Sequence, residues 1–463
     1  MVVSSDAETL DPRFVTDATG LRISRLVHAG LMRLDPDTGA PVPYLARGVT
    51  TSPDGLTVTF QLREDVYFHS GAPLTARDVV ATIHALRDPR LASRHARVLG
   101  AIAGALDTDP HTVVVTLSRP HATTLTDLEV PVLRADQVYD APDLGGTLDG
   151  LGPYRVVTRA RGSVELAPAD RGALPRPAHA VRVRSLRDEN ARALRLLTGS
   201  SDVAINALSP ALLPSLEAQG LRVASRPGLS VNYVVMRLDR GPFASLAARQ
   251  ALDASIDRES IVKHLLSGRA QIARGLLSPS HWAAAGGEPP AAFDLARARA
   301  LLGGAHLRAT LLCGTDRLRV DVARSIAQDA AGAGLDLEIV PLELGALLAR
   351  LAAGDFDAAT LQLPELVEPN TLRVFLHSTS IPPQGSNRGR VRDQALDELL
   401  DDGEATGDRS RRAAIYAKLE ARIRQQAFVL PLWHEDQIAV TGPRAAGFQT
   451  SAEGRWLGLA ALP

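Results

Sequence analysis

The sequence has a single cysteine, Cys313, so it can form neither an intramolecular disulfide nor a cysteine-based zinc site. Cys313 ends the apolar run Ala309-Thr-Leu-Leu-Cys313, which favours a buried structural thiol. No apolar run approaches the roughly 18 residues that a transmembrane helix needs. Aromatic residues make up only 4%, and lysine occurs only at positions 263 and 418, so the basic residues are nearly all arginine. A net charge of -1 gives no electrostatic reason to expect binding to nucleic acid.

The sequence also lacks a secretion signal, because Met1-Val2-Val3 leads directly into the polar residues Ser4-Ser5-Asp6-Ala7-Glu8. Two interpretations fit this start. Either the protein is cytoplasmic, or the sequence is a mature form in which a methionine replaces the removed signal.

Signatures of catalysis are missing as well. The sequence contains no Gly-x-Ser-x-Gly, no phosphate-loop lysine and no Gly-x-Gly-x-x-Gly motif. His434-Glu435 begins a zinc-protease pattern, but position 438 is Ile, so the second metal ligand is absent. The 12 histidines are scattered rather than spaced as ligands. We therefore expect no enzyme activity, no metal site and no cofactor.

The most informative stretch that is present runs from Ser52 to Val80. Pro53-Asp54-Gly55 has the composition of a turn, and the following residues alternate apolar with polar from Leu56 to Arg63, which predicts a half-buried strand. Thr75 with Asp78 three residues later forms a capping-box-like start. The helix predicted after it ends before Asp88-Pro89. A second alternating strand is predicted at residues 111–117.

In the second half of the chain, the pattern of apolar residues predicts strands that alternate with helices. Strands are predicted at residues 308–313, 336–340 and 356–363, and they are separated by amphipathic helices at residues 318–331 and 344–353. A further helix is predicted at residues 414–426. The β-α-β-α-β order predicts a parallel sheet covered by helices.

Five blocks of sequence together carry a resemblance to a known family. The run from Ser52 to Val80 is similar to its pattern D-G-x-x-y-x-F-x-L-R followed by a-x-D-V. The other blocks are Leu10-Asp11-Pro12 with Pro43-Tyr-Leu-Ala46, Gly150-Leu-Gly152-Pro-Tyr154, Gly241-Pro-Phe243 through Ile256-Asp-Arg258, and Gly385-Ser-Asn387 with the closing region 425–432. In this order they resemble the solute-binding proteins, family 5, that supply dipeptides, oligopeptides or nickel complexes to ABC importers.

The resemblance implies an α/β fold of the type II periplasmic-binding-protein class, with two lobes built on mixed sheets and an additional α+β domain inserted in the first lobe. The first lobe would comprise residues 1–35, 151–236 and 434–463, the additional domain residues 36–150, and the second lobe residues 237–433. The lobes would close on a small polar or peptide-like solute, which would then be delivered to the transmembrane subunits of an ABC permease.

The same resemblance implies a monomer outside the cytoplasm, either periplasmic or anchored to the membrane from that side. Two alternatives from other classes remain open at this point. The chain could be a cytoplasmic ligand-sensing module that kept the fold, or, as a more distant alternative, a hydrolytic enzyme.

Glu365 is the foremost candidate for a ligand contact. It directly follows the strand predicted at residues 356–363, and ligands of open α/β sheets bind beyond the carboxyl ends of strands. The resemblance places it where peptide-binding members have an Asp that pairs with the α-ammonium of the ligand. This chain departs from that pattern because it has Glu in place of Asp and Gln362 in place of an expected aromatic residue. The alternative for Glu365 is a solvated loop acid.

Other candidates have an equally plain alternative. Thr16 and Asp17 lie where the first lobe of the family usually touches the ligand, but they could instead cap the helix that follows. Asn387 corresponds to a recurrent family residue near the cleft, or it forms a turn. Arg134, Arg94 and Arg97 could bind a carboxylate bidentately, or they could form surface salt bridges.

Overall fold

The computed structural model describes residues 1–36, 38–143, 146–173, 175–284 and 292–462. The chain divides into two compact units, which we call unit 1 (residues 1–226 and 437–463) and unit 2 (residues 227–436). Strands β12 (Arg222–Pro227) and β18 (Val429–Thr441) are the places where the chain passes from one unit to the other. The expected lobe boundaries lie nearby, after residues 236 and 433. The finer division into five segments stays a prediction.

Among the described residues of unit 1, two sheets have three strands or more. One has the strand order β4-β5-β7-β6, and the other includes β11-β1-β10-β9-β8. The elements of unit 1 are α1 (Ala18–Val27), α2 (Ala76–Arg87), α3 (Thr124–Asp127), α4 (Glu189–Leu197), α5 (Leu213–Ala218), β1 (Val2–Val3), β2 (Met32–Leu34), β3 (Pro41–Pro43), β4 (Ala46–Thr51), β5 (Thr57–Leu62), β6 (Ile102–Asp109), β7 (Thr112–Leu117), β8 (Tyr154–Ala160), β9 (Ser163–Pro168), β10 (Val181–Ser185) and β11 (Val203–Ile205).

The alternating pattern after Gly55 forms β5, as predicted. Val58, Phe60 and Leu62 are at most 2% exposed, because they face a core that α2 closes from one side. The predicted capping box is present at the start of α2: the carboxylate of Asp78 accepts hydrogen bonds from the backbone N–H and the hydroxyl of Thr75, at 2.9 and 2.7 Å. This small sheet has a hydrophobic cluster of its own, separate from the clusters around β8 to β11.

Unit 2 is built on strands in the order β16-β15-β17-β13, with β13 pairing onward to β18. Its elements are α6 (Leu246–Ser255), α7 (Arg258–His264), α8 (Leu295–Leu302), α9 (Arg317–Ala331), α10 (Leu344–Ala353), α11 (Thr371–Leu376), α12 (Gln394–Ala405), α13 (Arg409–Gln426), β13 (Val231–Met236), β14 (Ala270–Ile272), β15 (Leu307–Gly314), β16 (Leu335–Leu342) and β17 (Ala358–Leu363).

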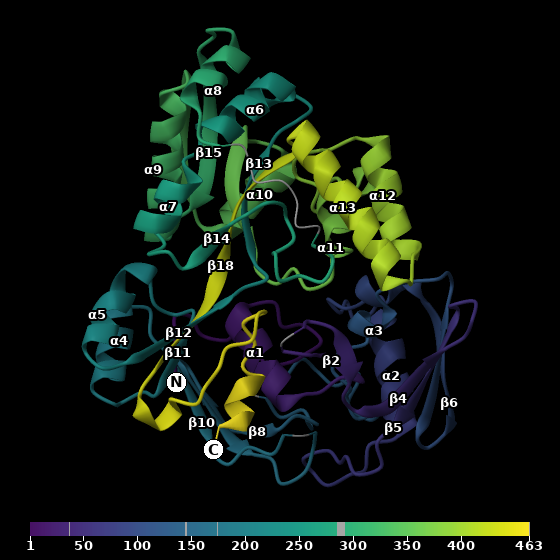
Figure 1. Cartoon of the computed structure of the whole chain (residues 1–463). Coiled ribbons are helices and arrows are strands. Elements are labelled where there is room, and N and C mark those ends of the chain that lie inside the picture. The colour runs from purple at the N-terminus through teal and green to yellow at the C-terminus, as the bar shows by residue number, and fades with distance from the viewer. Residues whose placement is uncertain (37, 144–145, 174, 285–291, 463) are drawn as a thin grey trace. The chain divides into compact units, whose positions relative to one another are not determined.

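The predicted β-α-β-α-β segment is confirmed, since β15 runs parallel to both β16 and β17. Side chains on β15 alternate between two cores. Leu311 and the buried Cys313 pack with α6 to α9, whereas Leu312 packs with α10 to α13. Helices therefore cover both faces of this sheet (Figure 1).

Helix α13 begins at Arg409, five residues before the predicted start. Asp408 is the N-cap, and its carboxylate accepts a hydrogen bond from the N–H of Arg411 at 2.8 Å. The additional turn carries Arg412, which contacts the segment that follows β17.

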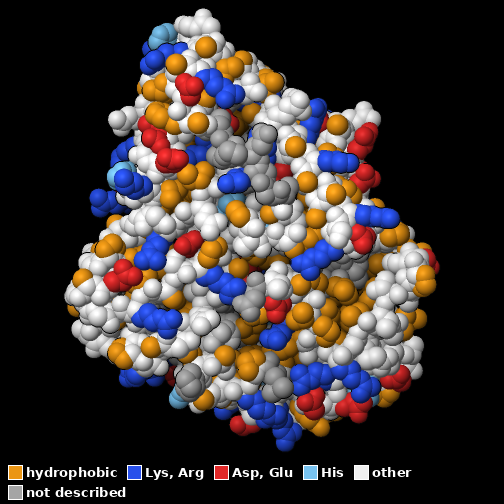
Figure 2. Space-filling view, viewed as in Figure 1, with side chains coloured by type: hydrophobic (Ala, Val, Ile, Leu, Met, Phe, Trp, Pro, Cys, Tyr) orange, Lys and Arg blue, Asp and Glu red, His pale blue; other side chains and the backbone are white. Residues whose placement is uncertain are grey.

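On the face drawn in Figure 2, basic side chains are interspersed with acidic ones, as a net charge of -1 suggests. None of the helices in the described part of the chain is both long and apolar enough to span a membrane.

Candidate functional site

The sheet of unit 2 has a topological switch point between β15 and β17. From β15 the chain passes through α9 to β16 on one side, and then through α10 to β17 on the other side. The two helices pack on opposite faces, so the connections separate at the carboxyl ends of β15 and β17. Such a crevice is the usual ligand-binding place in an open α/β sheet.

Four polar side chains meet at this edge, and we call them the polar quartet: Asn232, Arg319, Gln362 and Glu435. Asn232 on β13 lies opposite Gln362 on β17, Glu435 follows on β18, and Arg319 comes from the first turn of α9. Neighbouring strands place these side chains within reach of one another.

Arg319 is the centre of the quartet. Its Nη1 donates to Oδ1 of Asn232 at 2.5 Å and to Oε1 of Glu435 at 3.0 Å, and its Nη2 donates to Oε1 of Gln362 at 3.1 Å. Nδ2 of Asn232 and Nε2 of Gln362 each donate to Glu435, both at 3.0 Å. Within the quartet, the guanidinium of Arg319 is thus paired with the carboxylate of Glu435, and each amide accepts from Arg319 and donates to Glu435. Because the Arg319 and Glu435 side chains remain 28% and 24% exposed, the quartet can still meet a solute from the solvent side.

Glu365 lies two residues beyond β17 and is half-buried. The segment that carries Glu365 is held in place by hydrogen bonds or ion pairs at the three residues that follow it. The N–H of Leu366 donates to the carbonyl of Leu229 at 3.2 Å, the carbonyl of Val367 lies 2.8 Å from Nε2 of His281, and Glu368 pairs with Arg412 at 2.5 Å. A carboxylate on so constrained a backbone is suited to holding a cation in a defined place.

The tautomer of His281 follows from its two contacts. Its Nδ1 accepts a hydrogen bond from the N–H of Ala283 at 3.0 Å, so Nε2 carries the proton and donates to Val367. Burial lowers the pKa of His281 to about 4, which keeps the ring neutral at physiological pH. The pKa values of His28, His95 and His434 are lowered to about 4 by burial as well. These rings serve as structural groups rather than as acids or bases.

The remaining predicted residues have the following places. Thr16 is exposed in unit 1, and Asp17 caps α1, where its Oδ1 accepts from the N–H of Gly20 at 2.7 Å and its Oδ2 from that of Glu8 at 3.1 Å. Arg134, also in unit 1, forms ion pairs with Asp136 at 2.6 Å and with Asp149 at 2.9 Å.

Arg94 and Arg97 are exposed in unit 1, and Arg94 donates to the carbonyl of Val15 at 2.8 Å. Asn387 is fully buried in unit 2, where its amide donates to three backbone carbonyls and its Oδ1 accepts from the N–H of Val391. For each predicted site residue, contact with a ligand stays a prediction.

The sequence did not reveal the quartet as a group. Its members are separated by up to 203 residues, and only the pairing of β17, β13 and β18 brings them together. One signal was available: Arg319 stands in the first turn of a helix predicted directly after a strand, and ligands of open α/β sheets bind beyond the carboxyl ends of strands.

Among the residues that the structure describes, no group of three or more His, Cys, Asp or Glu side chains is arranged to hold a metal ion. Cys313 is fully buried, and burial raises the pKa of its thiol, so it does not form a reactive thiolate.

Relatives of known name agree with this architecture. Over 463 aligned positions the chain is 27% identical to the probable di/tripeptide-binding protein 5 of Pseudomonas aeruginosa, covering 92% of this chain and 88% of the relative. Over 311 positions it is 30% identical to the glutathione-binding protein GsiB of Salmonella typhi, covering 65% of this chain and 60% of that protein.

Two solved structures share the fold over nearly the whole chain. The structure of NikA from Brucella suis, in complex with Fe(III)-EDTA, has a TM-score of 0.89 at 22% identity and covers 99% of this chain and 98% of its own. DppA from Helicobacter pylori, in complex with the peptide STSA, has a TM-score of 0.84 at 22% identity, with 100% and 96% covered. The expected two-lobed α/β fold class is confirmed.

These relatives are binding proteins rather than enzymes, so the expectation of a non-catalytic protein is confirmed and a hydrolytic activity is not favoured. A cytoplasmic sensing module is not favoured either. Residues 40–369, which are more than half of the sequence, match the family described as bacterial extracellular solute-binding proteins, family 5 Middle. The chain belongs to the bacterial extracellular solute-binding proteins of family 5, as its motifs predicted.

Proposed function

We propose that this protein captures a small peptide-like or other polar solute outside the cytoplasm and delivers it, as a monomer, to the transmembrane subunits of an ABC permease. The family match over residues 40–369 is the observation that carries this proposal. The names of its relatives, a probable di/tripeptide-binding protein and a glutathione-binding protein, support a solute that carries peptide bonds.

In this proposal Glu365 binds the ammonium group of the solute. The segment around it is held by His281 and by the ion pair between Arg412 and Glu368, so its backbone needs little ordering when the solute arrives. A carboxylate that meets an ammonium in a partly desolvated place forms a charge-assisted hydrogen bond, which is stronger than a neutral one.

The polar quartet is the second part of the proposed site. Its carboxylate and guanidinium already compensate each other, so it offers hydrogen-bonding groups of both kinds without a net charge. Amide groups of a peptide-like solute fit such a surface, because each amide has one donor side and one acceptor side. Gln362 contributes an amide here where the family pattern has an aromatic residue.

The solute is best identified from the purified protein itself. Native mass spectrometry should detect a co-purified solute, and deletion of the gene should abolish uptake of that solute by the cells, with recovery when the gene is restored. Unchanged uptake in the deletion strain would refute the transport role.

The residue assignment is tested separately by calorimetry with the identified solute. If the solute bears an amine, Glu365→Gln should weaken binding about tenfold or more, since one charge-assisted bond is lost. Glu338→Gln is the matched control, because Glu338 lies exposed on β16. Equal affinity of the Glu365→Gln variant and the wild type would remove Glu365 from the site.

A further inference from the structure

Helix α13 contacts the segment that carries Glu365 through the side chain of Arg412. Nη2 of Arg412 lies 2.5 Å from Oε1 of Glu368, three residues beyond Glu365. The same carboxylate oxygen accepts a hydrogen bond from the N–H of Asn370 at 3.1 Å. The side chains of Arg412 and Glu368 are only 6% and 14% exposed. Because the pair is shielded from solvent, the loss of either partner should disturb the position of the other.

The guanidinium of Arg412 is enclosed by groups of the protein. Its Nε donates to the carbonyl of Gly403 on α12 at 2.9 Å. Its Cζ lies 5.2 Å from the ring centre of Trp282 and 5.7 Å from that of Tyr416, which are distances of cation–π contacts. A side chain enclosed in this way is poorly placed to touch a solute, but it is well placed to fix the position of Glu368.

Trp282 connects Arg412 to the other side chain that holds the segment. The ring centre of Trp282 lies 5.5 Å from that of His281, and Nε2 of His281 lies 2.8 Å from the carbonyl of Val367. The guanidinium of Arg409, one turn before Arg412 on α13, also lies over the Trp282 ring, at 5.0 Å. The contacts of His281 and Arg412 with the segment therefore belong to one network, and a change at Arg412 should reach the segment by both routes.

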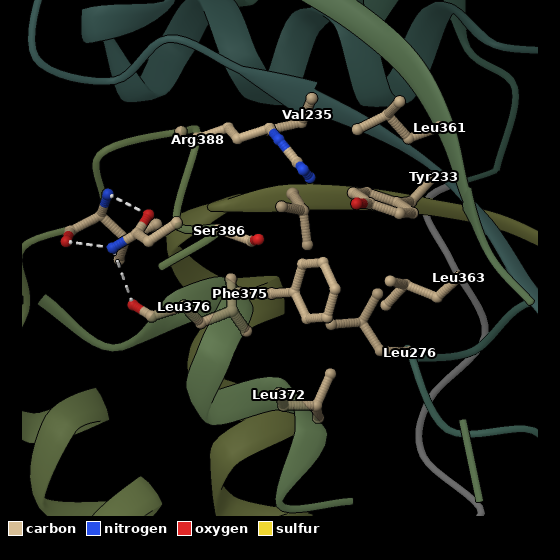
Figure 3. A pocket seen from close by; sticks show the side chains of 14 residues that line it. Tyr233, Val235, Leu276, Leu361, Leu363, Leu372, Phe375, Leu376, Ser386 and Arg388 are labelled. Atoms are coloured by element: carbon tan, nitrogen blue, oxygen red, sulfur yellow. Dashed lines mark hydrogen bonds between the residues drawn. The ribbon is translucent and has the colours of Figure 1, made fainter. Parts of the chain in front are cut away.

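Apolar packing holds the chain on either side of this segment. Leu363 ends β17 and Leu372 lies in the first turn of α11, and both gather with Leu276 and Phe375 in Figure 3. Leu363, Leu372 and Leu276 are buried. Since both ends of the segment are held by this packing, the polar contacts between them decide how its backbone runs.

We infer that Arg412 is a positioning residue for Glu365. Through Glu368 it holds the backbone that carries Glu365, and so it directs the Glu365 carboxylate towards the ammonium group of the solute without touching the solute itself. This inference rests on the proposed function, because it requires that Glu365 binds the ammonium group. A carboxylate held in one place loses less entropy on binding than one on a loose segment, so affinity for an ammonium group depends on Arg412.

The test is a double-mutant cycle, measured by isothermal titration calorimetry on the full chain with two probes, the dipeptide Ala-Leu and glutathione. Both probes carry a free ammonium group. Glu365→Gln should weaken their binding about tenfold or more, and Arg412→Met should weaken it about three- to tenfold. In the double variant the loss should equal that of Glu365→Gln alone, because Arg412 acts through Glu365. A general loss of structure would instead weaken binding in both backgrounds.

Hydrogen exchange gives a second readout that needs no solute. The N–H of Leu366 donates to the carbonyl of Leu229 at 3.2 Å, so its exchange reports how firmly the segment is held. Exchange of this amide should be faster in Arg412→Met and unchanged in Glu365→Gln. If Arg412→Met does not fold by circular dichroism, Glu368→Gln takes its place in the cycle. It keeps the size of the side chain but removes the charge that faces Arg412, and it should weaken binding only where Glu365 is present.

Arg411→Met is the matched control, because Arg411 is exposed next to Arg412 on α13. It should bind both probes as the wild type does. The inference is overturned if folded Arg412→Met binds like this control, or if it weakens binding equally with and without Glu365→Gln. Neither of these results affects the proposed function. If instead Glu365→Gln binds as the wild type does, or if neither probe binds the wild type, the proposed ammonium site is refuted and the inference fails with it.

Discussion

Replacing Arg319 by Met tests whether the polar quartet holds unit 2 together. Methionine keeps an unbranched apolar stem of similar length but removes three hydrogen bonds, to Asn232, Glu435 and Gln362. Asn232 is 3% exposed, so its Oδ1 would be left without a donor at a place that water hardly reaches.

The magnitude follows from these exposures. An unsatisfied buried acceptor costs about 1–3 kcal/mol. The Arg319–Glu435 pair adds at most about 1 kcal/mol, because both side chains are roughly a quarter exposed and solvent screens the pair. Together, Arg319→Met should lower the free energy of unfolding of unit 2 by about 1–4 kcal/mol.

The measurement is urea unfolding followed by tryptophan fluorescence, with Trp433 on β18 as a buried reporter within unit 2. Each phase should be analysed separately, since a chain with two compact units need not unfold in one step. Arg317→Met is the matched control on the same helix: the Arg317 side chain is 96% exposed and its Nε lies 3.7 Å from Asp321. The control should change stability by less than about 0.5 kcal/mol. If Arg319→Met lowers stability no more than the control does, Arg319 and Glu435 form an ordinary surface ion pair and our reasoning is wrong.

Three further perturbations have expected outcomes. The four buried histidines with pKa values of about 4 bind fewer protons in the folded chain than in the unfolded chain. The urea midpoint of unfolding should therefore fall as pH drops from about 6.5 towards 4. His281→Gln should make this dependence of the midpoint on pH less steep. Glu420 accepts a hydrogen bond from the N–H of Leu277 at 2.8 Å, and burial raises the pKa of its carboxyl, so ionisation of Glu420 opposes folding. The stability of the wild type should therefore decrease as pH rises through that raised pKa. In unfolding curves measured at several pH values, Glu420→Gln should abolish this decrease. Arg13 and Asp11 form an ion pair with both side chains 0% exposed, so Arg13→Met should cost about 3–5 kcal/mol in chemical denaturation, part of which Asp11→Asn in the same chain should restore. A urea midpoint that does not change with pH would contradict the histidine argument, and a Glu420→Gln curve parallel to that of the wild type would contradict the Glu420 argument. A loss of stability below about 1 kcal/mol for Arg13→Met would contradict the argument from the buried ion pair.

Local physical signals in the sequence were sufficient to predict much of the fold. The alternation after Gly55 predicts β5, and the spacing of Thr75 and Asp78 predicts the start of α2, because both depend on residues that are neighbours in the chain. The parallel arrangement of β15, β16 and β17 follows from their order with α9 and α10.

The candidate site could be predicted only in part. The position of Glu365 just beyond a strand follows from the order of residues in that part of the sequence. The contacts that hold its segment come from His281 and Arg412, about 84 and 47 residues away, and the sequence holds no local signal for them. Asn387 shows the same limit: an Asn between Ser and Arg fits a turn or a ligand contact equally well in sequence. Only the packing reveals that its amide is committed to the backbone.

The burial of Cys313 has a practical consequence for fluorescence labelling. It is the only cysteine of the chain, it is fully buried in β15, and its thiol has a raised pKa, so maleimide dyes should leave the native protein unmarked. Cysteines introduced at exposed positions, one in each unit, could therefore carry a donor and an acceptor dye without background. Energy transfer between the dyes would then report directly whether the distance between the units changes when a solute binds.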